Sequence, residues 1–124
     1  MRIWVPISIA QFETFDRSGS LEVSTGYALT RQFAQAQADP DEEVLESQIL
    51  EIAGAQNPMV LVVEAPANEL PGSGGEVSLT QSISQPQIQA FFAATAQEPD
   101  EMLWFGPSER PEIRGFLGLD VGSK

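Results

Sequence analysis

Apolar and polar positions alternate at the start of the chain. Over residues 3–7, isoleucine and valine occupy every second position, the spacing that places successive side chains on opposite faces of a β-strand. Ser8 follows, with Gln11 three residues later, and this pair has the spacing of a helix capping box. The pattern predicts a strand, then a short helix that stops near Gly19, then a short or bulged extended segment over residues 21–29.

Two further helical patterns come next. Thr30 is a candidate N-cap for a helix that contains Phe33. Asp39 is a candidate N-cap residue, and Pro40 then stands at the first helical position. The acidic residues after them stabilise a helix start, because their charge lies near the positive end of the helix dipole. We expect Gly54 to cap the end of this second helix. Its predicted buried face comprises Leu45, Ile49, Ile52 and Ala53.

Strand patterns dominate the second half of the chain. Residues 59–63 form a continuous apolar run, which indicates a central strand covered on both faces. Residues 64–75 contain prolines and glycines and are expected to form a flexible loop, before a one-sided strand over residues 77–83. The segment 102–105 predicts a last strand, and residues 108–117 predict a terminal helical turn or two.

One segment between these strands has helical spacing. Ser84 and Gln87 repeat the capping-box pattern. Ile88, Phe91 and Phe92 then follow at i, i+3 and i+4, the spacing of one helix face. We therefore expect a core-facing helix that follows Ser84 and ends near Ala96.

This order of elements predicts an α+β fold. It matches a ferredoxin-like sandwich, in which a four-stranded, mainly antiparallel sheet carries helices on one face, with short extra helices added here. The strand over residues 59–63 is expected to pair with the strand over residues 77–83, and the first and last strands are expected to lie beside each other or centrally. We expect one domain over residues 1–118 and a C-terminal tail over residues 119–124.

The charge distribution adds a constraint on partners. The chain has eighteen Asp and Glu residues against six Lys and Arg residues, a formal net charge of −12, and every charged residue between positions 32 and 109 is acidic. Such a surface repels phosphate backbones and anionic lipid, so we expect no direct binding to nucleic acid or membranes. It suits a basic protein partner or a cation, or it serves only to keep a small protein soluble.

The composition excludes several chemistries. The chain contains no cysteine and no histidine, which rules out disulfides, thiolate nucleophiles, Cys/His zinc sites and Ser-His-Asp triads. The acidic segment 39–43 lacks the central glycine of a calcium loop, and Leu50 stands where that loop needs glutamate. Glu64 stands directly after an apolar strand and is the best candidate for general acid–base catalysis by a carboxylate. No catalytic, metal or cofactor residue is assigned from the sequence, and no cofactor is expected.

Targeting signals are not apparent in the pattern. The first residues lack the apolar core of a signal peptide, and no apolar run approaches the ~20 residues that span a bilayer. We therefore expect a cytoplasmic protein.

Two tryptophans lie within predicted strands. If the strands of Trp4 and Trp104 are neighbours, both indoles share one sheet face and anchor an interface. The alternative is that both indoles fill the core between the sheet and the helices. The candidate interaction surface combines these aromatic residues with the acidic helix start and comprises Trp4, Trp104, Phe105, Asp41, Glu42, Glu43 and Glu46.

Four segments, in their order and spacing over most of the chain, carry a family resemblance. They are Met1-Arg2-Ile3-Trp4-Val5-Pro6, residues 26–30 (Gly-Tyr-Ala-Leu-Thr), residues 41–46 (Asp-Glu-Glu-Val-Leu-Glu) and residues 60–64 with Pro66. With them the chain resembles a family of small actinobacterial proteins that forms a domain of unknown function. It departs from that pattern at Arg31, where proline is usual, and in its C-terminal third. The resemblance implies an actinobacterial cytoplasmic protein and assigns no role to any residue.

These observations favour a non-enzymatic protein–protein interaction or regulatory module. Its partner is expected to be another protein, of basic character, and a homodimer is a further option. One alternative is a carboxylate-based small-ligand-binding or metal-binding protein or enzyme. Another is an acidic surface that imitates DNA toward a basic nucleic-acid-binding protein.

Overall fold

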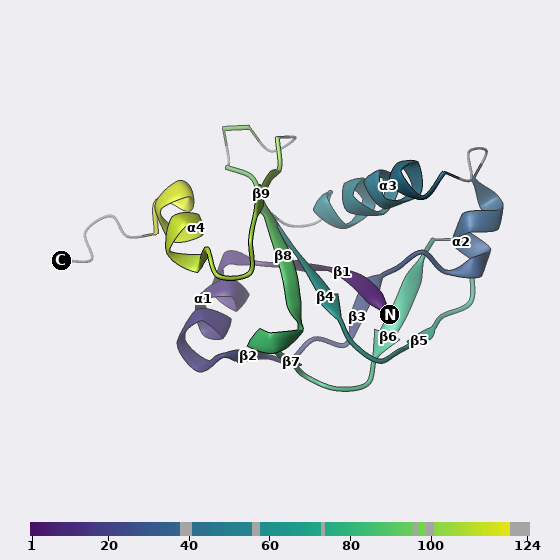
Figure 1. Ribbon diagram of the computed structural model, residues 1–124, viewed down its shortest axis with the longest axis horizontal. Coiled ribbons are helices and arrows are strands. Elements are labelled where there is room, and N and C mark those ends of the chain that lie inside the picture. Colours follow the sequence, from purple (N-terminus) through teal and green to yellow (C-terminus); the bar gives the residue numbers. More distant parts are fainter. Residues whose placement is uncertain (38–40, 56–57, 73, 96, 99–100, 120–124) are drawn as a thin grey trace.

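An antiparallel sheet of seven strands runs through the centre of the molecule (Figure 1). The computed structural model describes residues 1–37, 41–55, 58–72, 74–95, 97–98 and 101–119. The strands of the sheet are β1 (Arg2–Ile7), β3 (Thr25–Tyr27), β4 (Met59–Glu64), β5 (Ala67–Glu69), β6 (Glu76–Leu79), β8 (Ile88–Ala93) and β9 (Leu103–Phe105). Their spatial order is β5-β6-β3-β1-β4-β8-β9, which puts β1 in the middle.

Helices and a small second sheet complete the architecture. The second sheet pairs β2 (Ser20–Leu21) with β7 (Ile83–Ser84). The helices are α1 (Ile9–Ser18), α2 (Arg31–Ala36), α3 (Glu42–Gly54) and α4 (Arg110–Leu117), with a 3₁₀ turn, η1 (Gln85–Gln87). Within the described residues no helix has both the length and the apolar character needed to cross a bilayer.

The seven-stranded sheet overturns the ferredoxin-like expectation, although the class is α+β. The sheet has three more strands than expected, and the helices cover both of its faces instead of one. Alternate residues of β1 show this arrangement directly. Ile3 and Val5 pack in one core cluster with Phe12 of α1, whereas Trp4 packs in the other with Ile49 of α3. The period of two in a central strand thus supplies both halves of the core.

The strand neighbours also differ from the expectation. The continuous apolar run did predict β4, whose residues 59–63 are all buried, with β1 on one side and β8 on the other. The expected pairing of this strand with residues 77–83 is wrong, because β6 pairs with β3 and β5 instead. The last strand, β9, lies at an edge of the sheet and not beside β1. Part of the expected loop over residues 64–75 forms the opposite edge strand, β5.

The predicted helix after Ser84 is wrong. Only the 3₁₀ turn η1 follows the capping residue, whose backbone N–H donates to Gln87 Oε1 at 2.8 Å. The chain then extends as β8 between β4 and β9. Phe91 faces the α1 side of the sheet and Phe92 faces the α3 side, as neighbouring residues of a strand do.

The helix starts follow the capping signals closely. Ser8 caps α1 with the full capping box, and a glycine in the left-handed conformation ends the helix. The start of α3 is shifted, since Asp41 is its N-cap, while the expected cap Asp39 and Pro40 lie outside the described residues. Gly54 is the last helical residue and Ala55 the C-cap, one position later than expected. Most of the expected tail, residues 120–124, also lies outside the described part.

Thr30 provides a test of a buried cap. Its side chain is buried, and its hydroxyl oxygen accepts the N–H of Phe33 at 3.1 Å. We expect Thr30→Val to lower the free energy of unfolding by about 1 kcal/mol, because the N–H at the start of α2 loses its acceptor. Urea denaturation measures the loss. The matched control is Thr14→Val at an exposed position of α1, and equal losses in both variants would show that the cap contributes nothing specific.

Candidate functional site

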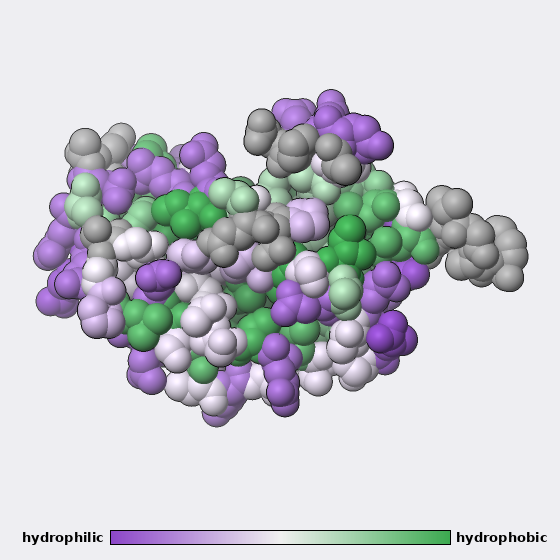
Figure 2. All heavy atoms as spheres, turned by 180° about the vertical axis from the view of Figure 1, so that it is seen from behind, coloured by the Kyte–Doolittle hydropathy of each residue, from purple (hydrophilic) through white to green (hydrophobic). Residues whose placement is uncertain are grey.

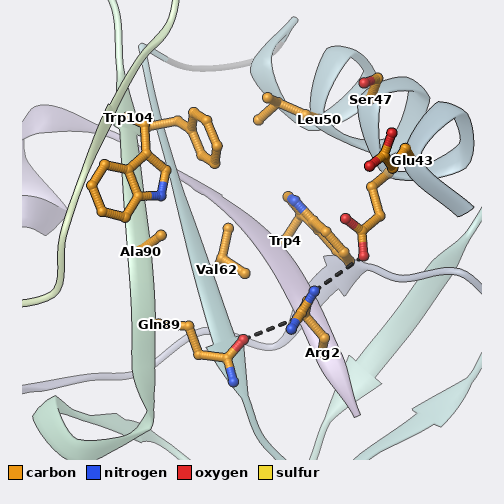
Figure 3. Close-up of a pocket in the computed structure, with 11 residues that line it drawn as sticks. Arg2, Trp4, Glu43, Ser47, Leu50, Val62, Gln89, Ala90 and Trp104 are labelled. Carbon is orange, nitrogen blue, oxygen red and sulfur yellow. Dashed lines mark hydrogen bonds and ion pairs between the residues drawn. The ribbon is translucent and has the colours of Figure 1, made fainter.

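A groove of about 620 Å³ opens between α3 and the β8–β9 end of the sheet (Figure 3). Four strands supply its floor from one sheet face, because Trp4 pairs with Val62, Val62 with Ala90, and Phe92 with Trp104. The helix packs on β1, β3 and β4, which leaves the far end of this face as an open depression. The wall on the helix side is formed by Glu43, Glu46, Ser47 and Leu50.

The two tryptophans play different parts in this groove. Trp4 is 5% exposed and belongs to the core beneath α3, as the core interpretation expected. Trp104 is 60% exposed on the edge strand β9. Their strands are not neighbours, since β4 and β8 lie between them. The two indoles nevertheless line the same groove from opposite sides, because both side chains point to the α3 face (Figure 3).

The other candidate residues divide between the groove and its surroundings. Glu43 and Glu46 line the groove. Glu42 lines a smaller hollow of about 320 Å³ beside it, together with Glu64. Asp41 caps α3, where its Oδ1 accepts a backbone N–H at 2.9 Å.

Phe105 lies away from the groove. Its neighbour in the strand points to the α3 face, so Phe105 turns to the opposite face and packs on Phe116 of α4, with ring centroids 5.5 Å apart. Four of the seven candidate residues are thus brought together at the groove, and three are not.

Arg2 is the basic residue of the groove, and the sequence reasoning did not single it out. Its Nη1 donates to Glu46 Oε2 at 3.1 Å, and its Nε donates to Gln89 Oε1 at 3.0 Å (Figure 3). The guanidinium therefore links β1 to both α3 and β8. One signal was present in the sequence, since Arg2 stands two residues before Trp4 in a predicted strand and so shares its face.

Gln89 reaches the groove through an irregularity in β8. The register shifts between Val62 and Val63, whose partners are Ala90 and Ile88, so that Gln89 is the extra residue of a β-bulge. The bulge places the side chains of two consecutive residues, 89 and 90, along the same groove. The sequence offered no signal for this bulge, because the same segment has the spacing of a helix.

Glu64 does not have the properties of an acid–base catalyst. A hydrogen bond from the Met1 amino group, at 2.7 Å, holds the pKa of the Glu64 carboxyl below its ordinary value. A carboxylic acid that donates protons near neutral pH needs the opposite shift. The side chain is also half exposed, and it lies outside the larger groove. Among the described residues, no three carboxylates are placed to share a metal ion.

No family model, curated protein or solved structure matches this chain. The resemblance to the actinobacterial family therefore stays a prediction. The functional argument rests on the groove and its chemistry.

Proposed function

We propose that this chain is a non-enzymatic interaction module, and that its groove between α3 and β9 binds a basic, partly apolar segment of a partner protein. The observation that carries the proposal is the meeting of an exposed tryptophan and an acidic wall in one open groove. An aromatic anchor and an excess of one charge are the features by which a surface selects a partner of complementary shape and charge.

Trp104 supplies the apolar anchor. Its side chain is the most exposed large hydrophobic group of the described residues, and Leu50 and Phe92 extend the apolar surface beside it. Tryptophan contributes strongly at interfaces because a large flat surface is removed from water with little loss of side-chain freedom. The apolar part of the partner segment therefore belongs at the β9 end of the groove.

The acidic wall selects the charge of the partner. Glu46 already pairs with Arg2, whereas Glu43 has no ion-pair partner among the described residues. The net charge of −12 attracts a basic segment over a distance and repels a second copy of the chain. On the face in Figure 2, hydrophobic residues lie in patches with hydrophilic and intermediate residues between them. Among the described residues, the exposed large hydrophobic side chains are Met1, Val44, Leu103 and Trp104, which favours a small groove over a broad apolar dimer interface.

Short synthetic peptides that place leucine, phenylalanine or tryptophan next to arginine test the proposal by titration calorimetry. We expect them to bind the wild-type chain, with affinity that falls as salt is raised. We expect Trp104→Ala to weaken binding at least about tenfold, because tryptophan anchors of this kind carry a large share of the binding energy. Glu43→Gln should weaken it less, by about two- to fivefold.

The matched control for charge is Glu69→Gln on β5, at the opposite edge of the sheet. It changes the net charge as Glu43→Gln does, and we expect it to bind the peptides as the wild type does. Circular dichroism and urea unfolding establish that each variant is folded. Wild-type affinity in Trp104→Ala, or no binding of any basic peptide to the wild type, would overturn the proposal.

A further inference from the structure

We infer that the groove contains a guanidinium subsite, which the chain's own Arg2 fills and which an arginine side chain of the partner takes over on binding. This inference rests on the proposed function and names the side chain that the groove selects. It also gives Arg2 a role as an internal competitor for the site.

The geometry around Arg2 defines the subsite. Two acceptors on different elements, Glu46 Oε2 of α3 and Gln89 Oε1 of β8, meet one planar group at 3.1 and 3.0 Å. A guanidinium presents several N–H donors in a fixed plane and satisfies both acceptors at once, whereas an ammonium is a compact, strongly hydrated point charge. Trp4 lies beside this group on the same strand face, as Figure 3 shows. The site is thus already shaped for arginine in preference to lysine.

The contact with Arg2 is suited to exchange. The side chains of Arg2 and Glu46 are 49% and 30% exposed, and ion pairs so open to water add little to stability. An incoming guanidinium would restore both hydrogen bonds that Arg2 gives up. The released Arg2 side chain is close to the solvent that it already contacts, so the exchange needs no opening of the core.

The charge of the remaining groove lining disfavours an anion that would bind to Arg2, and it favours a second cation. Glu43 lies one turn from Glu46 on α3, and both carboxylates line the groove against the single positive charge of Arg2. The lining therefore carries net negative charge while Arg2 is in place. A partner arginine adds the charge that balances it.

Peptides that are identical except for arginine, lysine or glutamine at the basic positions test the subsite by titration calorimetry. We expect the arginine peptide to bind the wild type about tenfold more tightly than the lysine peptide, and the glutamine peptide to bind weakly. We expect Arg2→Gln to bind the arginine peptide about three- to fivefold more tightly than the wild type does, because the competing group is removed.

Arg17→Gln is the matched control, since it removes the same charge from an exposed position of α1 on the other side of the sheet. It corrects for the general effect of a more negative chain, and we expect a smaller gain than in Arg2→Gln. A structural role of Arg2 alone predicts the reverse, a loss of affinity in Arg2→Gln.

The outcomes separate this inference from the proposed function. Equal binding of the arginine and lysine peptides, or equal gains in Arg2→Gln and Arg17→Gln, would overturn the guanidinium subsite and leave the interaction module standing. Binding of no basic peptide overturns both. A last arm uses free arginine amide, and if it binds as tightly as the peptide, the site serves a small guanidinium compound and the partner arginine is refuted.

Discussion

Phe91→Ala is expected to lower the free energy of unfolding by about 3–5 kcal/mol, the range for removing a fully buried phenylalanine. Phe91 is 0% exposed and lies in β8 between Leu61 of β4 and Phe105 of β9. Its ring meets that of Phe12 edge to face, with centroids 6.1 Å apart and planes at 89°. The substitution leaves a cavity where α1 packs on the sheet. Urea denaturation followed by circular dichroism measures the loss.

Phe92→Ala is the matched control, because it removes the same side chain from the next residue. Phe92 is only partly buried, on the opposite face and at the groove, so we expect a loss of about 1–2 kcal/mol. A helix that turned both rings into the core would give similar losses at the two positions. Losses of equal size would therefore contradict the strand and favour the helix expected from the sequence.

The missed strand has a specific physical cause. In a regular strand, residues that share a face are two apart, but Ile88 and Phe91 share the α1 face although they are three apart. The extra residue Gln89 in the bulge creates this spacing, and it imitates the i, i+3 pattern of a helix. The capping box at Ser84 strengthened the same interpretation, although in the structure it belongs to a single 3₁₀ turn.

The elements that the sequence did predict have strong local causes. The alternation in β1, the continuous apolar run of β4 and the capping residues Ser8 and Thr30 act within a few residues of chain. The order of strands in the sheet has no such local signal, since it depends on pairing between segments far apart in the chain. Two edge strands of three residues each, β5 and β9, extend the sheet beyond what a local pattern can predict.

The candidate site shows the same division between local and distant causes. Tryptophans and acidic residues stand out in a composition that has no histidine or cysteine, and four of the seven chosen residues line the groove. Burial of one tryptophan and exposure of the other follow from the positions of β1 and β9, in the middle and at the edge of the sheet. The contact of Arg2 with Glu46 joins residues 44 positions apart, so it becomes visible only once α3 lies over β1.

Gly75→Ala is expected to lower the free energy of unfolding by about 3 kcal/mol, because two unfavourable effects coincide at this position. The backbone φ of Gly75 is +79°, a conformation in which side chains other than hydrogen are strained. A Cβ atom there would also lie 2.8 Å from Ile49 Cδ1 and 2.9 Å from the carbonyl oxygen of Ala28. Gly75 and Ala28 are also tied together directly, because the carbonyl oxygen of Gly75 accepts the N–H of Ala28 at 2.8 Å. Gly75 stands just before β6, so a shift at this position would disturb the start of that strand.

Gly19→Ala separates the two effects. Gly19 has the same φ of +79°, but no neighbouring atom lies within 4 Å of the position of its Cβ. We expect this variant to lose only about 1 kcal/mol, the cost of the left-handed conformation alone. The additional loss in Gly75→Ala then measures the cost of the two close approaches, one to the backbone oxygen of Ala28 and one to the end of the Ile49 side chain on α3. The end of the Ile49 side chain can turn aside, whereas the carbonyl oxygen of Ala28 is fixed by the backbone. We therefore expect most of the additional loss to come from the approach to Ala28, and equal losses in the two glycine variants would show that the backbone there yields without cost.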